Sequence, residues 1–289
     1  MRSRALRPRP ARPQAEFPSH SKTPELLTVA GRGNLGRSLA RALHAHLVPA
    51  RTGFRLPRRG LLFLAIPDAA VSGMATRIAR MEPPAELAVV HLSGALGLGA
   101  LGALEGNPRG SFHPLQSFSS PRGPEAFRRI TIAVDATSPA LRRQLSALAR
   151  KLGARPRHVD DSRRVLYHAA AVYASNYVNV VIAEAVAMFG RIGWSEGEAT
   201  RALMPLVEGA VENIRKRGPV QALTGPVRRG DAETVARHLE AVEDPNLYRM
   251  LGLVALEIAK KAGLDPAAAE RTKRALTRDV AATRRRGRR

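Results

Sequence analysis

Short, almost wholly apolar runs alternate with amphipathic stretches through the first half of the chain. Each run has the length and continuous apolar character of a strand buried on both faces of a parallel sheet. The runs occupy residues 26–30, 61–66, 87–92 and 130–134. Leucines at helical spacing follow the first and last runs, at Leu35, Leu39 and Leu43 and at Leu141, Leu145 and Leu148. We therefore expect an α/β domain with a doubly wound parallel sheet, closed by an edge strand near residues 158–159.

The pattern becomes helical from about residue 161. A long apolar helix is expected first, and a glycine- and proline-rich loop interrupts the helices that follow it. The helices are expected at residues 163–192, 196–216, 232–242, 246–262 and 266–283. Ser195, Asp231 and Asp265 stand where helix N-caps are expected. The organisation predicted is an α/β domain over residues 25–160 and an all-α C-terminal domain over residues 161–283.

Three glycines follow the first apolar run in G-x-G-x-x-G spacing. Gly31 permits a tight turn, Gly33 lets the backbone approach a pyrophosphate, and Gly36 lets helix and strand pack closely. Backbone N–H groups at the helix start, around Asn34 and Leu35, would hold the phosphates. The context of strand, turn and helix predicts a Rossmann-like dinucleotide site. The alternative is a glycine turn that binds no ligand.

The segment after this helix departs from the usual dinucleotide-binding pattern. A second strand that ends in an acidic residue is expected about 20 residues beyond the glycines. Residues 26–67 contain no Asp or Glu, and arginines including Arg51 fill a short connection instead. A block of chain is therefore expected to be absent here, where the second strand and its following segment should be. Arginines suit the 2′-phosphate of NADP, although they can equally coat a shortened connection.

Polar side chains follow the next strands at the edge where open α/β sheets bind ligands. Pro67 and Asp68 come directly after one strand, and we expect Asp68 to cap the following helix and border the cofactor's ribose and nicotinamide. His91 and Ser93 end another strand. His113 lies in a polar-aromatic segment, residues 110–118, that is expected to be a loop. A histidine here can exchange the proton that accompanies hydride transfer, or it can be a satisfied structural residue.

The long apolar helix carries a second polar group. His168, Ser175, Asn176 and Asn179 lie at spacings that place them on one helix face. Polar groups in an apolar helix need partners, so this face either bonds to backbone at the domain junction or lines a polar cleft.

Composition excludes several classes of chemistry. The 289 residues include no cysteine, which excludes disulfides, thiolate metal sites and cysteine nucleophiles. A metal between His91 and His113 is not expected, because no carboxylate cluster accompanies them. The apolar helix is interrupted by polar groups and no signal-peptide core follows the N-terminal arginines. A soluble cytoplasmic protein without membrane contact is therefore expected.

The formal net charge of +23 raises the question of nucleic-acid binding. Much of the charge lies at the ends, in residues 1–24 and 284–289. Both are expected to be disordered basic segments, the first because five prolines accompany its arginines. Nucleic-acid binding is not favoured, because charge alone specifies neither a fold nor a partner.

Six motifs occur along the chain in a recognisable order: GRGNLG, LFLAIPD, VVHLSGALG, GSFHPLQSF, VLYHAAAVYASNYV and ALTGPVRRGD. Over residues 26–263 the chain resembles uncharacterised bacterial oxidoreductase-like proteins, which have a Rossmann-like half and a helical C-terminal domain of unknown function. More distantly it is similar to pyrroline-5-carboxylate reductase, ketopantoate reductase and the 6-phosphogluconate dehydrogenase-like group. The resemblance implies NADP or NAD as cofactor, a small carbonyl or imine substrate, and a homodimer formed through the helical domain. The catalytic lysine of β-hydroxyacid dehydrogenases has no match, and His168 and Asn176 lie on the corresponding helix.

These observations lead to one leading hypothesis, an NADP-preferring oxidoreductase acting on a small-molecule substrate in an inter-domain cleft. Ser93, His113, His168 and Asn176 would surround the substrate carbonyl. Either histidine would donate the proton, and Asn176 would orient the substrate. Three further residues, Thr224, Arg229 and Asp231, would complete the cleft or simply cap the loop. The alternatives are a nucleotide-binding sensor or scaffold that contacts nucleic acid through its tails, and a degenerate oxidoreductase without turnover.

Overall fold

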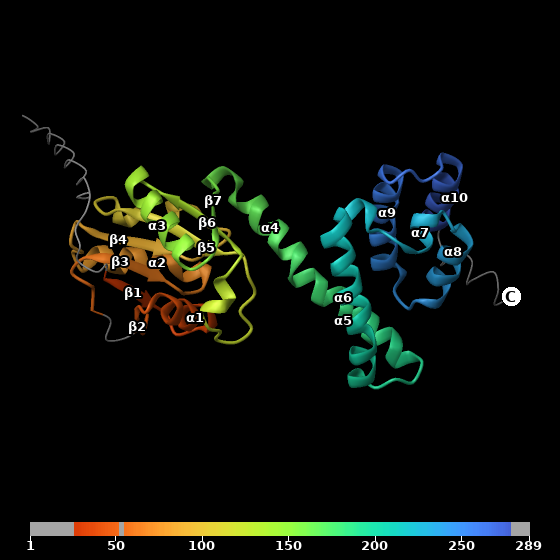
Figure 1. Ribbon diagram of the computed structural model, residues 1–289, viewed down its shortest axis with the longest axis horizontal. Coiled ribbons are helices and arrows are strands. Elements are labelled where there is room, and N and C mark those ends of the chain that lie inside the picture. The colour runs from red at the N-terminus through yellow and green to blue at the C-terminus, as the bar shows by residue number, and fades with distance from the viewer. Residues whose placement is uncertain (1–25, 52–54, 279–289) are drawn as a thin grey trace, which may run out of the picture. The chain divides into compact units, whose positions relative to one another are not determined.

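The computed structural model describes residues 26–51 and 55–278 (Figure 1). The predicted basic segments at both ends, and the last residues of the final predicted helix, lie outside this part of the chain. Backbone contacts divide the chain into two units, one ending at Val178 and the other starting at Asn179. Each unit is described by itself. The first includes the helix that follows Asp160, because side chains of that helix contact the sheet.

A seven-stranded sheet forms the centre of the first unit. Its strand order is β2-β1-β3-β4-β5-β6-β7. The strands are β1 (Leu27–Ala30), β2 (His46–Val48), β3 (Gly60–Leu64), β4 (Leu87–His91), β5 (Arg109–Pro114), β6 (Thr131–Ala136) and β7 (Arg155–His158). Every described pairing is parallel except that of β5 with β6. The predicted parallel sheet is confirmed, with one antiparallel pair added.

Helices cover both faces of this sheet, as the doubly wound prediction requires. Helices α1 (Asn34–Leu43) and α3 (Pro139–Lys151), with the 3₁₀ turn η2 (Pro124–Phe127), pack on one face. Helix α2 (Asp68–Arg80) and the 3₁₀ segment η1 (Leu98–Leu104) pack on the other. Alternate residues of β3 divide between the two cores: Leu61 and Phe63 enter the first, Leu62 and Leu64 the second. Burial on both faces explains the continuous apolar runs.

The second strand is present, so the expectation that this block is absent was wrong in part. Helix α1 ends at Leu43, and His44 adopts a left-handed conformation with φ 52° that turns the chain back to the sheet. Strand β2 then pairs in parallel with β1, from Thr28↔His46 to Ala30↔Val48. Three residues are too few to produce a visible apolar run. The connection from β2 to β3 remains short and contains no helix among its described residues.

Residues 110–114 of the segment predicted as a polar-aromatic loop belong to strand β5, so that prediction was wrong in part; residues 115–118 lie outside helices and strands. Gly110, Ser111 and Phe112 are buried between β4 and β6. Neighbouring strands on both sides satisfy the backbone groups, and the Ser111 hydroxyl bonds to a buried arginine. The polar character that suggested a loop therefore reflects a buried polar contact.

The long apolar helix is two helices. The 3₁₀ turn η3 (Asp161–Arg163) leads into α4 (Arg164–Ala174), and α5 (Asn176–Arg191) follows a break at Ser175, where φ is −128° and ψ is −69°. The common helix face predicted for His168, Asn176 and Asn179 does not extend through that break. Several apolar side chains of α4 and α5 are exposed, among them Val165, Leu166 and Tyr173. The predicted homodimer stays a prediction.

One helical stretch in the described part of the chain, Asp161–Arg191, is long and apolar enough to cross a membrane by length and composition. That finding is weak support for a membrane span, because core helices of soluble proteins meet the same two criteria. It nevertheless differs from the expectation that polar interruptions exclude such a span.

The second unit is helical, as predicted. Its further helices are α6 (Glu196–Gln221), α7 (Gly225–Arg229), α8 (Ala232–Ala241), α9 (Pro245–Lys261) and α10 (Pro266–Thr277). The expected caps are confirmed, since Ser195, Asp231 and Asp265 accept hydrogen bonds from backbone N–H groups in the first turns. Val235 and Leu256 belong to the small core that α7 to α10 enclose.

Candidate functional site

Two glycines of the turn between β1 and α1 are required by packing. Gly31 has a φ of +125°, and a Cβ there would lie 2.0 Å from the carbonyl oxygen of Ala65. A Cβ on Gly36 would lie 2.1 Å from the carbonyl oxygen of Gly31. Any side chain at either position would push the strand, the turn and the helix apart.

Gly33 differs, because an added Cβ would meet no heavy atom within 4 Å. Gly33 is the N-cap of α1, with no side-chain cap, and no acidic residue occupies the first turn. The Asn34 side chain donates to the carbonyl oxygen of Phe118 at 3.0 Å and so turns away from the helix start. The helix therefore presents uncapped backbone N–H groups and the positive end of its dipole at an open turn. That arrangement suits an anion such as pyrophosphate.

The end of β2 lies beside this turn. The backbone N–H of Gly31 donates to the carbonyl oxygen of Val48 at 3.0 Å. Beyond the strand, the Arg77 guanidinium donates to the carbonyl oxygens of Ala50 at 3.2 Å and Arg51 at 2.6 Å. These bonds hold the segment that carries the exposed Arg51 side chain against α2, three residues beyond the bond between Val48 and the glycine turn.

Asp68 and Ser93 join the carboxyl ends of β3 and β4. The expected cap was wrong: Pro67 occupies the N-cap position of α2, and the Asp68 carboxylate accepts a hydrogen bond from the Ser93 hydroxyl at 2.7 Å. The same hydroxyl accepts from the backbone N–H groups of Ala95 at 3.1 Å and Leu96 at 3.0 Å. Because Ser93 forms three bonds inside the protein, its hydroxyl shapes the turn after β4. Its predicted contact with substrate stays a prediction.

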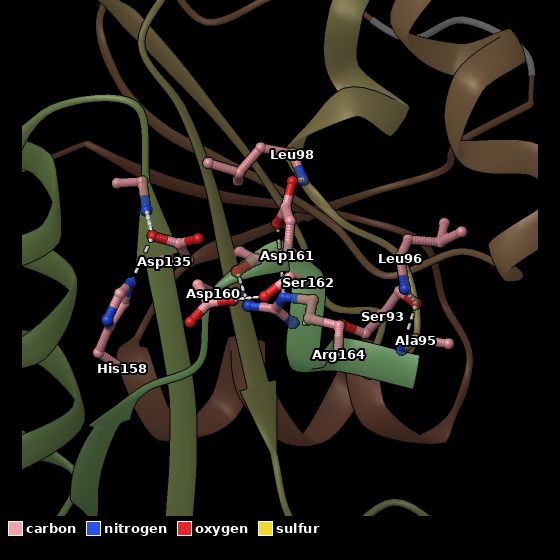
Figure 2. A network of polar contacts seen from close by, with 12 residues as sticks. Ser93, Ala95, Leu96, Leu98, Asp135, His158, Asp160, Asp161, Ser162 and Arg164 are labelled. Carbon is pink, nitrogen blue, oxygen red and sulfur yellow. Dashed lines mark hydrogen bonds and ion pairs between the residues drawn. The ribbon is translucent and has the colours of Figure 1, made fainter. Parts of the chain in front are cut away.

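A buried arginine ties the start of α4 to this sheet edge. The Arg164 side chain has no exposed surface, and it donates to the carbonyl oxygen of Ser93 at 3.3 Å and to the Ser111 hydroxyl. Asp161 lies 4.0 Å from its guanidinium and also accepts from the backbone N–H of Leu98 at 2.8 Å. Figure 2 shows this network, with Arg164 between Asp161 and Ser93. One charged side chain thus connects α4, β4 and β5.

The same helix brings aromatic and imidazole groups to β4 and β5. His113 Nδ1 lies 2.8 Å from the Tyr167 hydroxyl, and the two rings meet edge to face. His168 packs against His113 with ring centroids 6.1 Å apart. Both histidines converge on Gly94, where an added Cβ would lie 2.7 Å from His168 Nδ1 and 2.8 Å from His113 Nε2. The structure thus brings two of the predicted catalytic residues together directly after β4.

Burial makes this group of histidines weakly basic. Desolvation, and then the charge of His168, lowers the pKa of His113 to about 4. Desolvation, and then the charge of Arg164, lowers the pKa of His91 to about 4. Desolvation raises the pKa of Tyr167. At neutral pH both His91 and His113 are therefore uncharged, and the Tyr167 hydroxyl keeps its proton.

The remaining predicted residues belong to other elements. Asn176 is exposed as the first residue of α5, beyond the break that ends α4. Thr224, Arg229 and Asp231 belong to the second unit. Thr224 and Arg229 line a cavity of about 610 Å³ there, whereas Asp231 caps α8.

Sequence reasoning missed Arg164 and Tyr167. Arg164, Tyr167 and His168 lie at positions i, i+3 and i+4 of one helix, so they share a face. A charged residue in an otherwise apolar helix, on the face that carries a histidine, was the available signal. Ser111 was hidden because its segment looked like a loop.

Comparisons with solved structures agree with this architecture. A candidate NADP oxidoreductase from Bacteroides fragilis is 22% identical, covers 82% of this chain and 98% of its own, and superposes with a TM-score of 0.67. A protein from Thermotoga maritima is also 22% identical, over 82% of this chain and 99% of its own, with a TM-score of 0.65. The Plasmodium falciparum pyrroline carboxylate reductase, solved with NADP bound, is 13% identical over 88% and 98%, with a TM-score of 0.55. These likenesses establish the fold.

Among curated proteins, none matches the chain. The model of a family described as a domain of unknown function, DUF2520, matches residues 130–256. That range begins at the end of the sheet that carries β6 and β7 and extends through α4 into α9. The chain thus joins a Rossmann-like N-terminal half to a region that the DUF2520 model matches.

Proposed function

We propose that the protein is an NAD(P)-dependent oxidoreductase that reduces a small carbonyl or imine, or oxidises the corresponding hydroxy or amino compound. One observation carries this proposal: Gly33 is open while Gly31 and Gly36 are packed against the protein. A turn with a purely structural role needs glycine only at the two packed positions. At position 33 a side chain would fit beside the uncapped helix start, so packing does not explain the third glycine. A dinucleotide needs that space for its pyrophosphate.

The residues around the turn fit a nicotinamide dinucleotide. The backbone at Gly33, Asn34 and Leu35 would hold the pyrophosphate, and the ends of β3 and β4, with Pro67 and Gly94, would border the nicotinamide half. When bound, the reduced cofactor supplies a hydride. Similarity of fold to a reductase solved with NADP supports the same assignment.

His113 and His168 are the groups of this chain best placed to handle the accompanying proton. Both lie beside Gly94, directly after the strand whose carboxyl end faces the cofactor side in Rossmann-like sheets. The other predicted contributor, Asn176, would orient the substrate if α5 brings it to the same place. The geometry thus favours proton transfer to an oxygen or nitrogen of the substrate at the end of β4.

Arg51 is proposed to favour NADP over NAD. Its segment follows β2, whose last residue bonds to Gly31 of the glycine turn, and residues 26–67 offer no carboxylate for a ribose hydroxyl. Titration of the protein with NADPH and NADH, followed by fluorescence, should show tighter binding of NADPH. If neither nucleotide binds below about millimolar concentration, the proposal fails.

Replacing Arg51 by glutamate should weaken NADPH binding about 10–100-fold, the range for loss of one charge-assisted phosphate contact. NADH binding should change much less, because NADH lacks the 2′-phosphate. Arg143→Glu on α3 is the matched control, since it makes the same charge change at an exposed position outside the proposed site. Equal losses for NADPH and NADH in Arg51→Glu would contradict the role of Arg51 in selecting the phosphate.

A further inference from the structure

The His113 ring is held on one side by a tyrosine. The Tyr167 hydroxyl lies 2.8 Å from Nδ1, and the perpendicular packing of the two rings, with centroids 5.6 Å apart, fixes their orientation. One of these two groups must donate to the other. The ring nitrogen can accept only if its proton is carried by Nε2.

The other side of the ring faces the end of β4. His113 Nε2 and His168 Nδ1 both come within 2.8 Å of the point where a Gly94 Cβ would stand. His168 Nδ1 is buried and has no hydrogen-bond partner among the described residues. A buried polar atom without a partner is unusual, and it marks a place where a ligand atom or water can bond.

We propose that the Tyr167 hydroxyl donates to His113 Nδ1 and thereby holds His113 as the Nε2–H tautomer, which presents a proton donor to the substrate beside Gly94. Tyr167 is a positioning residue in this arrangement, and His113 is the donor. The inference rests on the proposed oxidoreductase function, because that function supplies the substrate atom that takes the proton.

The surrounding charges support a neutral donor. The groups that act on His113 are His168 and Arg164 from α4, which disfavour its protonation, Asp68 from α2, which favours it, and the neighbouring His91. Burial outweighs the carboxylate and lowers the pKa of His113 to about 4. A protonated imidazolium is therefore scarce at neutral pH, and donation must come from the neutral ring.

A neutral imidazole is a practical proton donor only when its other nitrogen gains a proton in the same step. As the substrate carbon receives the hydride, the Nε2 proton passes to the substrate oxygen or nitrogen. The Tyr167 hydroxyl proton passes to Nδ1, so the ring ends neutral as the opposite tautomer. After the product leaves, the proton on Nδ1 returns to the half-buried Tyr167 oxygen and water supplies a proton to Nε2, which restores the hydroxyl and the Nε2–H tautomer. No charge accumulates on the imidazole at any point in this sequence.

Nitrogen NMR of the histidine rings tests the assignment in the full-length protein, without a substrate. His113 signals are identified by their loss in His113→Asn. In the wild type they should show the neutral Nε2–H tautomer, unchanged from about pH 5.5 to about pH 8. In Tyr167→Phe they should shift toward a mixture of tautomers, because phenylalanine keeps the ring packing and removes the hydroxyl.

Tyr173→Phe is the matched control, since Tyr173 is an exposed tyrosine of the same helix that packs on Tyr177 instead. It should leave the His113 signals in place. An Nδ1–H tautomer in the wild type would overturn the proposal, and so would His113 signals that do not move in a folded Tyr167→Phe variant. If that variant does not fold, the wild-type tautomer alone decides. Cofactor binding is measured in a separate experiment. Absence of NADPH or NADH binding would reject the proposed function, and the NMR result on the His113 tautomer could still be interpreted.

Discussion

Replacing Arg164 by alanine is expected to lower the free energy of unfolding by about 3–5 kcal/mol, the range for breaking a buried charged pair. Arg164 is fully buried and bonds to the carbonyl oxygen of Ser93 and the hydroxyl of Ser111. Alanine would leave both acceptors unpaired in the interior and a cavity beside them. Urea unfolding followed by circular dichroism measures the loss.

Two further variants separate the causes. Arg164→Met fills most of the same volume without the hydrogen bonds, so it should recover the cavity part of the loss and retain the polar part, about 1–3 kcal/mol. Arg163→Ala removes the neighbouring arginine, whose side chain is 82% exposed, and should change stability by less than about 0.5 kcal/mol. A loss of under about 1 kcal/mol in Arg164→Ala would show that Arg164 does not tie α4 to the sheet.

Acid is expected to destabilise the protein between pH 6.5 and about 4, the interval set by His91 and His113. Each has an ordinary pKa of 6.5 that falls to about 4 in the folded state. Below pH 6.5 the two histidines bind protons in the unfolded chain but not in the folded chain. Their contribution to the free energy of unfolding is therefore complete above pH 6.5 and is lost as pH falls toward 4. The loss is at most about 3.5 kcal/mol for each histidine, at about 1.4 kcal/mol per pKa unit.

The comparison that isolates this effect is the slope of stability against pH in wild type, His91→Gln, His113→Gln and the double variant. Glutamine keeps a polar side chain but does not titrate. Each single variant should reduce the slope between pH 4 and 6.5, and the double variant should reduce it most. A double variant with the wild-type slope would mean that other groups cause the acid sensitivity.

The parts of the fold that the sequence predicted correctly are those whose signal is local. The glycines at 31, 33 and 36 lie within one turn, and helix caps such as Ser195 and Asp231 bond only three residues onward. Buried strands such as β3 and β4 have continuous apolar runs because both of their faces are covered.

The errors arose where a residue's partner lies far away in the sequence. Ser111 made its strand look like a loop, because the arginine that satisfies its hydroxyl is 53 residues away. Tyr167 meets His113 over a separation of 54 residues, so neither residue alone reveals the pair. Asp68 had the sequence position of a helix cap, but its carboxylate accepts a hydrogen bond from the Ser93 hydroxyl, 25 residues further along the chain. Polar partnerships of this kind follow from the sheet order, which local patterns do not specify.

The most direct test of the cofactor site is NADPH titration, followed by fluorescence, of Gly33→Val beside the wild type. Gly33 has an ordinary φ of −68° and free space around its missing side chain, so valine should leave the fold and the melting temperature nearly unchanged. Gly73→Val, at a glycine of α2 that is equally free of neighbours, is the control and should bind NADPH like the wild type. The account predicts that Gly33→Val loses NADPH affinity by about 100-fold or more, or about 3 kcal/mol. A folded Gly33→Val protein that binds NADPH as tightly as the wild type would contradict a dinucleotide site at this turn.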